Sequence, residues 1–305
     1  MRIPRPFSRL PALAILALTL VVATALMGVA QLFPESRRLT ESPMGAMLVV
    51  YLGIVLVLLG MARFASLDWN RLLGPTLPHT EWQLASVAFP LAAMSYGGFW
   101  LFWVPLSYVI PGVVQSYALE GMPDLLSRND PARLFLDIVG ITVVAPVVEE
   151  ILFRGFLLHR FAARWGTTAG IIVSSAFFAI LHVELIGHFL FGVAMCALYI
   201  RSRSLWLPIL AHAVNNAFAL SFAFPDALGG APEAPATIQE FRAEWPTGLV
   251  ALVLGAAGLM WFWRRFAPHG AWTLPYAVEV PVDDPIDPID PVEPQPADAP
   301  VGGVS

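Results

Sequence analysis

The sequence predicts an all-α polytopic membrane protein, a bundle of about eight transmembrane helices, and three observations support this class. Hydrophobic residues make up 57% of the 305 residues and charged residues only 13%, about half the charged fraction of a soluble domain. Mean hydropathy is +0.70. Long apolar stretches follow one another, and arginine gathers in alternate connections between them. We therefore expect no separate soluble domain large enough to fold alone.

Eight apolar stretches are candidates for crossing the hydrocarbon core, which takes about 20 helical residues. They cover residues 11–33, 44–64, 83–112, 134–158, 168–186, 188–200, 204–224 and 247–263. The first follows three arginines and looks like a signal peptide, but its length and weak cleavage signals predict a retained span. The third contains three prolines and predicts one kinked helix. The sixth is the shortest.

The positions of the charged residues predict the orientation. All 17 basic residues are arginine. With the N-terminus inside, most of them fall in cytoplasmic segments, which is the positive-inside bias. An even number of spans then places the C-terminus inside as well. We expect a bacterial inner-membrane protein that crosses the bilayer several times and has both termini in the cytoplasm.

The chain divides into four predicted parts. About three spans fill residues 1–133, and a core at 134–224 carries the polar motifs described next. An outer loop and the last span follow at 225–266. The final part, 267–305, is an acidic tail that repeats Asp-Pro followed by Ile or Val. Such a composition cannot bury enough apolar surface to fold, so we predict a disordered cytoplasmic tail.

The stretch at 146–155 places two carboxylates and a guanidinium inside an apolar run. A charge near the bilayer centre costs from ~3 to more than ~10 kcal/mol, so Glu149, Glu150 and Arg154 must face a polar cavity. Glu150 and Arg154 are four residues apart and can pair on one helix face, whereas Glu149 lies about 100° round the helix. A structural ion pair explains Glu150 and Arg154 only. Glu149, which is less well compensated, suits a general base.

Two later apolar stretches each contribute a histidine. Phe178 lies one turn before His182, and His212 lies one turn before Asn216, so each pair shares a helix face. A histidine beside a carboxamide can donate two hydrogen bonds to one oxygen, as an oxyanion site requires. Taken singly, each histidine is equally well explained by interhelical hydrogen bonds worth ~1 kcal/mol. Together with the glutamates they favour a hydrolytic site.

Other kinds of site have little support in the sequence. Cys196 is the single cysteine, which excludes an intrachain disulfide and argues against a thiolate metal cluster. There is no Gly-rich phosphate loop and no basic patch with interleaved aromatics, so we expect no nucleic-acid partner. The His-Glu-x-x-His motif of soluble zinc proteases is also absent.

The three motifs resemble, in order and spacing, those of the CPBP intramembrane metalloproteases. This family includes the type II CAAX prenyl endopeptidases and the proteins similar to lysostaphin resistance protein A. The motifs are Glu149-Glu150-x-x-x-Arg154, Phe178-x-x-x-His182 and His212-x-x-x-Asn216. The resemblance covers roughly residues 134–220. It implies that Glu150 and Arg154 orient the site, and that His212 and Asn216 stabilise the tetrahedral oxyanion.

The resemblance also implies an endopeptidase that acts on a membrane-anchored protein or peptide in the lipid bilayer. Glu149 would be the base that activates a water, and His182 would help to hold that water. No cofactor is certain: Glu149, His182 and His212 also have the chemistry of a three-ligand site for a divalent metal such as zinc. Because one carboxylate would then serve as both ligand and base, we favour the metal-free water.

Two points stay open at this stage. Glu149 and His212 lie about 12–15 Å from the inner ends of their predicted helices, whereas His182 lies about 22 Å from its own. We expect a tilt, a late helix start or an open cavity to bring them together. The alternative functions are a non-enzymatic bacteriocin-immunity or membrane scaffold protein, and a transporter, although no inverted repeat of broken helices is evident.

Overall fold

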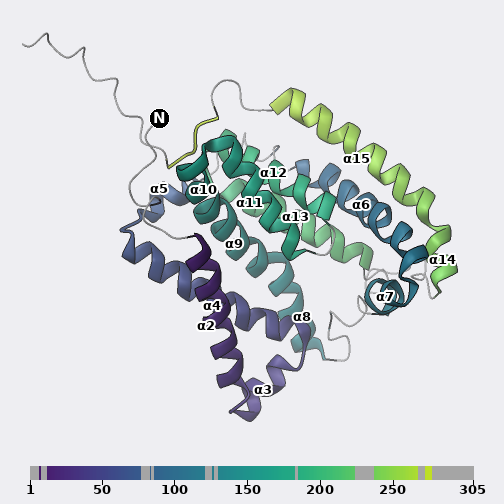
Figure 1. Ribbon diagram of the computed structural model, residues 1–305, viewed down its shortest axis with the longest axis horizontal. Coiled ribbons are helices and arrows are strands. Elements are labelled where there is room, and N and C mark those ends of the chain that lie inside the picture. The colour runs from purple at the N-terminus through teal and green to yellow at the C-terminus, as the bar shows by residue number, and fades with distance from the viewer. Residues whose placement is uncertain are drawn as a thin grey trace, which may run out of the picture.

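The computed structural model (Figure 1) describes residue 7 and residues 12–76, 83, 86–120, 126, 130–182, 185–223, 237–266 and 272–276. Within these ranges all regular structure is helical, with no strand. The first helices are α2 (Ala12–Ala30), α3 (Pro34–Thr40), α4 (Pro43–Phe64), α5 (Trp69–Leu73), α6 (Ala88–Val109), α7 (Pro111–Val114) and the π-helical η2 (Gln115–Glu120). The central run comprises α8 (Pro131–Val139), η4 (Gly140–Val144), α9 (Ala145–Glu150), η5 (Ile151–Leu157) and α10 (Leu158–Trp165). The remaining helices are α11 (Thr167–Leu181), α12 (Leu185–Ser202), α13 (Trp206–Ala223), α14 (Ile238–Ala243) and α15 (Trp245–Phe266). The chain is an all-α membrane helix bundle, as the sequence predicts.

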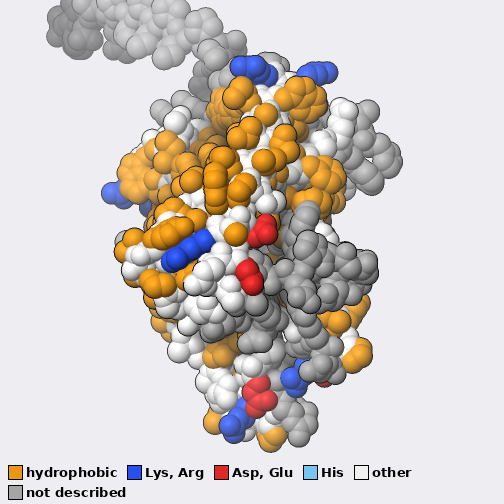
Figure 2. Space-filling model, turned by 90° about the vertical axis from the view of Figure 1, so that its right-hand side faces the viewer, with side chains coloured by type: hydrophobic (Ala, Val, Ile, Leu, Met, Phe, Trp, Pro, Cys, Tyr) orange, Lys and Arg blue, Asp and Glu red, His pale blue; other side chains and the backbone are white. Residues whose placement is uncertain are grey.

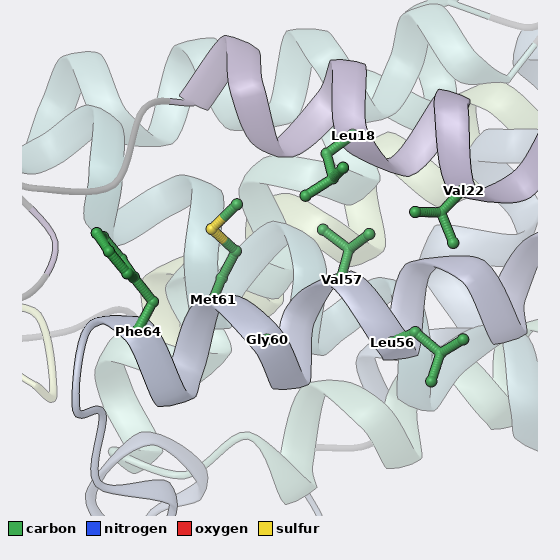
Figure 3. A pocket seen from close by; sticks show the side chains of 7 residues that line it. All are labelled: Leu18, Val22, Leu56, Val57, Gly60, Met61 and Phe64. Carbon is green, nitrogen blue, oxygen red and sulfur yellow. The ribbon is translucent and has the colours of Figure 1, made fainter.

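Helices α2 and α4 pack side by side and leave an apolar groove of about 720 Å³ between them (Figure 3). The groove is lined by Leu18, Val22, Leu56, Val57, Gly60, Met61 and Phe64. At about 100° per residue, Leu56, Gly60 and Phe64 lie roughly 140–220° round α4 from Tyr51. Tyr51 is buried. One face of α4 therefore borders the groove, and the opposite face reaches the interior.

Helices α6 and α15 run side by side at the other end of the bundle (Figure 1). Glycines allow this close approach: a Cβ on Gly97 would lie 2.6 Å from the backbone nitrogen of Leu252. Figure 2 views the side of α14 and α15 and shows hydrophobic side chains over a broad area. Exposed apolar side chains of α15 include Leu249, Val250, Val253, Leu254, Met260 and Trp261. Such a surface suits contact with lipid.

The central run from α8 to α10 is one nearly continuous helical path that changes pitch twice. We predicted a span at 134–158, and the run is longer, from 131 to 165. It ends at Gly166, whose φ of +87° lies in the left-handed region that glycine adopts without strain. The π-helical segments η4 and η5 flank α9, and such segments are frequent at functional sites.

A helix lies at each of the eight predicted stretches. Among the described residues, four are long and apolar enough to cross a membrane: Pro43–Phe64, Ala88–Val109, Leu185–Ser202 and Trp245–Arg265. The sixth stretch, the shortest in the sequence prediction, is one of these four because its helix extends at both ends. Thr167–Leu181 and Ala17–Ala30 are shorter apolar helices. The count of eight spans and their orientation remain predictions.

The segment at 272–276 differs from the predicted disordered tail, because it packs against the bundle. Leu274 and Tyr276 are buried. The Tyr276 hydroxyl accepts the N–H of Asp68 at 2.9 Å, and Arg203 Nη2 donates to the Pro275 carbonyl at 2.9 Å. The Asp-Pro repeats lie outside the described residues. Two aromatic and aliphatic side chains before the repeats therefore give this stretch apolar surface to bury.

Candidate active site

Four segments bring the predicted site residues to one region of the bundle. Glu149 and Glu150 end α9, Arg154 lies in η5, His182 directly follows α11, and His212 and Asn216 lie in α13. The helices that carry them are neighbours in the bundle, since α13 contacts both α9 and η4. The site therefore draws on helices that are far apart in the sequence.

The Glu150–Arg154 pair predicted from its spacing is present and buried. Arg154 Nη1 donates to Glu150 Oε1 at 2.8 Å, and the two side chains are 1% and 0% exposed. Arg154 Nη2 also donates to the Gly192 carbonyl at 3.2 Å, and the guanidinium lies 4.8 Å from the Phe178 ring centroid. His212 Nδ1 lies 2.9 Å from Glu150 Oε1. Because a carboxylate only accepts, the His212 imidazole donates from Nδ1, and its Nε2 is the ring nitrogen left to face the site.

Glu149 has two oxygens in different surroundings. Oε1 accepts a hydrogen bond of 2.5 Å from the Tyr51 hydroxyl. Oε2 is buried without a hydrogen-bond donor among the described residues. His182 Nε2 and His212 Nε2 lie 3.8 Å and 3.9 Å from it, which is beyond hydrogen-bond distance. A buried carboxylate oxygen without a partner costs free energy unless a ligand supplies one.

His182 reaches this oxygen because α11 ends just before it. The residue has extended backbone, with φ −111° and ψ 133°. Its Nδ1 donates to the Phe178 carbonyl at 2.8 Å, so Nε2 points away from its own helix end. The ring stacks on Phe178 at 4.3 Å and on His188 at 4.4 Å. The depth difference anticipated from helix lengths is thus removed, and His182 and His212 approach the same carboxylate.

Asn216 occupies a different position from the other site residues. In η4 the N–H of Ala145 bonds to the Gly140 carbonyl, five residues back. The next residue, Pro146, has no N–H, and Asn216 Nδ2 donates to the Ile141 carbonyl at 2.9 Å. Asn216 therefore ties α13 to the segment just before the two glutamates. One of its two N–H groups is committed to that bond, and its predicted oxyanion role stays a prediction.

The predicted metal ligands Glu149, His182 and His212 match a zinc site in chemistry but not in spacing. Each histidine donates its Nδ1 proton to a carboxylate or carbonyl, as metal-bound histidines do. Ligands of tetrahedral zinc at ~2.0–2.1 Å stand roughly 3.4 Å apart, less than the separations of 3.8 and 3.9 Å. An oxygen about 2.8 Å from each atom would fit those separations. No group of three or more His, Cys, Asp or Glu residues in the described ranges has metal-site spacing.

The sequence prediction missed three partners of the site. Tyr51 comes from α4, far upstream of the motifs, and the other two are the backbone carbonyls of Ile141 and Gly192. Tyr51 had a signal in the sequence, because it is the one side chain with a hydroxyl in the apolar run 44–61. The carbonyls had none, since nothing in the sequence marks a backbone group that a distant side chain will bind.

Comparisons with known proteins match the same part of the chain. Residues 131–218 match the family described as type II CAAX prenyl endopeptidase Rce1-like. A Bacillus subtilis protein named "Putative membrane peptidase YdiL" is 33% identical over 87 residues, 27% of this chain and 35% of that protein. An Escherichia coli protein named "Uncharacterized 24.3 kDa protein" is 30% identical over 120 residues, 37% of this chain and 51% of that protein.

These matches cover only part of each protein. The aligned regions span about a third and about half of the length of the two curated relatives. No solved structure matches the chain. The family match includes all three motifs but neither α4 nor α15. The resemblance read from the motifs is confirmed, and the segment that carries the site, residues 131–218, belongs with the Rce1-like type II CAAX prenyl endopeptidases.

Proposed function

We propose that the chain is a membrane-embedded endopeptidase that hydrolyses a peptide bond with a water activated by Glu149. The observation that carries this proposal is the buried Oε2 of Glu149, which has no donor among the described residues and faces Nε2 of two histidines. This arrangement offers three acceptors around one position. A water there would donate its two protons and present a lone pair to a substrate carbonyl carbon.

The proposed reaction has two proton transfers. Glu149 Oε2 takes a proton from the water as its oxygen bonds to the carbonyl carbon, which forms a tetrahedral oxyanion. Glu149 then gives this proton to the amide nitrogen as the C–N bond breaks, so that a carboxylic acid and an amine leave. His182 and His212 hold the water through their Nε2 atoms. The base regains its charge when the product amine departs.

The other motif residues act through these groups. Arg154 keeps Glu150 ionised, and Glu150 holds the His212 ring by its Nδ1–H. We assign the oxyanion to His212 and to the Asn216 N–H that Ile141 does not use. That assignment rests on the motif spacing. The buried, water-poor surroundings would strengthen each of these interactions.

We propose a membrane-anchored protein or peptide as the substrate and the bacterial inner membrane as the location, with both termini cytoplasmic. The family name supports cleavage near a lipid-anchored end of a substrate. The arginine distribution supports the orientation. His182 has 28% of its side chain exposed, the largest exposure among the groups around Glu149, and a substrate would approach from that side.

Peptide hydrolysis in proteoliposomes tests the proposal. The full chain and Glu149→Ala are each mixed with two quenched fluorescent peptides, one ending in a prenylated cysteine motif and one anchored by an apolar helix. We expect cleavage by the wild type, none by Glu149→Ala, and no effect of a chelator. Loss of cleavage with chelator would replace the free water by a metal site. Absence of cleavage of both peptides, with a folded wild type, would favour the immunity or scaffold function.

A further inference from the structure

Tyr51 contacts the proposed base from outside the family-matched segment. It lies in the middle of α4, about 80 residues before residue 131, where the match begins. Its side chain is buried, and its hydroxyl donates to Glu149 Oε1 at 2.5 Å. Helix α4 packs against α9 and η4, which carry the glutamates and the Asn216 contact. The first half of the chain therefore supplies a direct hydrogen bond to the site.

This bond makes the two oxygens of Glu149 unequal. The last side-chain torsion of glutamate is broad and roughly two-fold, so an untethered carboxylate samples many orientations. Here the phenol occupies Oε1, and Oε2 is the oxygen that faces His182 and His212. The donor that the described residues offer to Oε1 is Tyr51 alone. Its hydroxyl thereby selects which oxygen can take a proton from the water.

The charged and titratable neighbours of Glu149 do not perform this task. On its own helical run, Arg154 is directed at Glu150 and at a backbone carbonyl. His182 and His212 approach Oε2 and not Oε1. A hydroxyl that donates to Glu149 is also committed to it, so it is not the donor for a substrate oxyanion in this arrangement.

We propose that Tyr51 is a positioning residue for the base: its hydroxyl holds one oxygen of Glu149 so that the other stands between the two imidazole nitrogens. This inference rests on the proposed function. It adds a residue that the three motifs do not contain. It also gives α4 a direct part in catalysis through the orientation of Glu149.

The test is Tyr51→Phe, which removes the hydroxyl and keeps the ring. A hydrogen bond to a charged group that acts during the chemical step should show mainly in the turnover number. We expect kcat to fall about 10- to 100-fold and KM to stay within about 2-fold. The matched control is Tyr199→Phe, which loses a buried hydroxyl bonded to the Leu72 carbonyl at 2.9 Å, away from the site. We expect its kcat to stay within about 3-fold of wild type.

The outcomes separate this inference from the proposed function. Unchanged kcat in Tyr51→Phe, with wild type active and Glu149→Gln inactive, overturns the inference and leaves the proposed function standing. Equal losses in Tyr51→Phe and Tyr199→Phe, or failure of Tyr51→Phe to fold, also overturn it, because Tyr51 would then be a structural residue. A folded wild type that cleaves neither peptide overturns the proposed function and this inference with it.

Discussion

Removing Arg154 should destabilise the whole bundle, because it leaves a carboxylate buried without its cation. Glu150 is fully buried, and its Oε1 accepts from both Arg154 and His212. In Arg154→Met the side-chain volume is roughly kept, but Glu150 loses the charged partner. Breaking a buried ion pair in this way costs about 3–5 kcal/mol. At roughly 2–4 °C per kcal/mol for a chain of this size, the unfolding temperature should fall by about 6–20 °C.

The assay is thermal unfolding of the purified protein in nanodiscs, followed by tryptophan fluorescence. The matched control is the double variant Glu150→Gln/Arg154→Met, in which no charge stays buried alone. Since replacing both members of a buried pair is often nearly neutral, the double variant should regain most of the lost stability. An Arg154→Met protein that unfolds within about 2 °C of wild type, or a double variant less stable than the single one, would refute the reasoning.

Three further predictions concern packing and can be measured by the same unfolding assay. Gly74→Ala should cost more than about 2 kcal/mol, because φ is +73° and the new Cβ would meet a backbone oxygen at 2.1 Å; a neutral result would contradict the observed turn. Gly192→Ala should cost about 1–3 kcal/mol, because the Cβ would lie 2.8 Å from the Ser175 Cβ; unchanged stability would show that α11 and α12 can separate freely. Tyr276→Phe should cost about 1 kcal/mol, because the Asp68 N–H loses its acceptor, and equal stability would indicate that the 272–276 segment is not held there.

The site residues could be predicted because their cost in a membrane makes them conspicuous. Glu149, Glu150 and Arg154 stand in an apolar run, and a spacing of four correctly predicts the ion pair. The positions of the helices also follow from apolar stretches of sufficient length. The convergence of His182 with Glu149 could only be expected, because it depends on where α11 ends and on the extended backbone that follows.

The features that sequence reasoning missed depend on contacts between distant segments. Whether a lone tyrosine in an apolar helix faces lipid or a carboxylate is decided by the rotation of α4 against α9. The π-helical segments were not foreseen, since nothing local distinguishes a bond to the fifth residue from one to the fourth. The segment at 272–276 was grouped with the acidic tail, although Leu274 and Tyr276 give it apolar surface to bury.

The most direct test of the central claim is the single-turnover cleavage rate of Glu149→Gln beside wild type, in the proteoliposome assay. Glutamine keeps the shape and can still accept from Tyr51, but it cannot take a proton from water. A general base contributes about 10²- to 10⁴-fold to a rate, so cleavage should fall by at least about 100-fold while the unfolding temperature stays close to that of wild type. A Glu149→Gln protein that cleaves at the wild-type rate would contradict the assignment of Glu149 as the base.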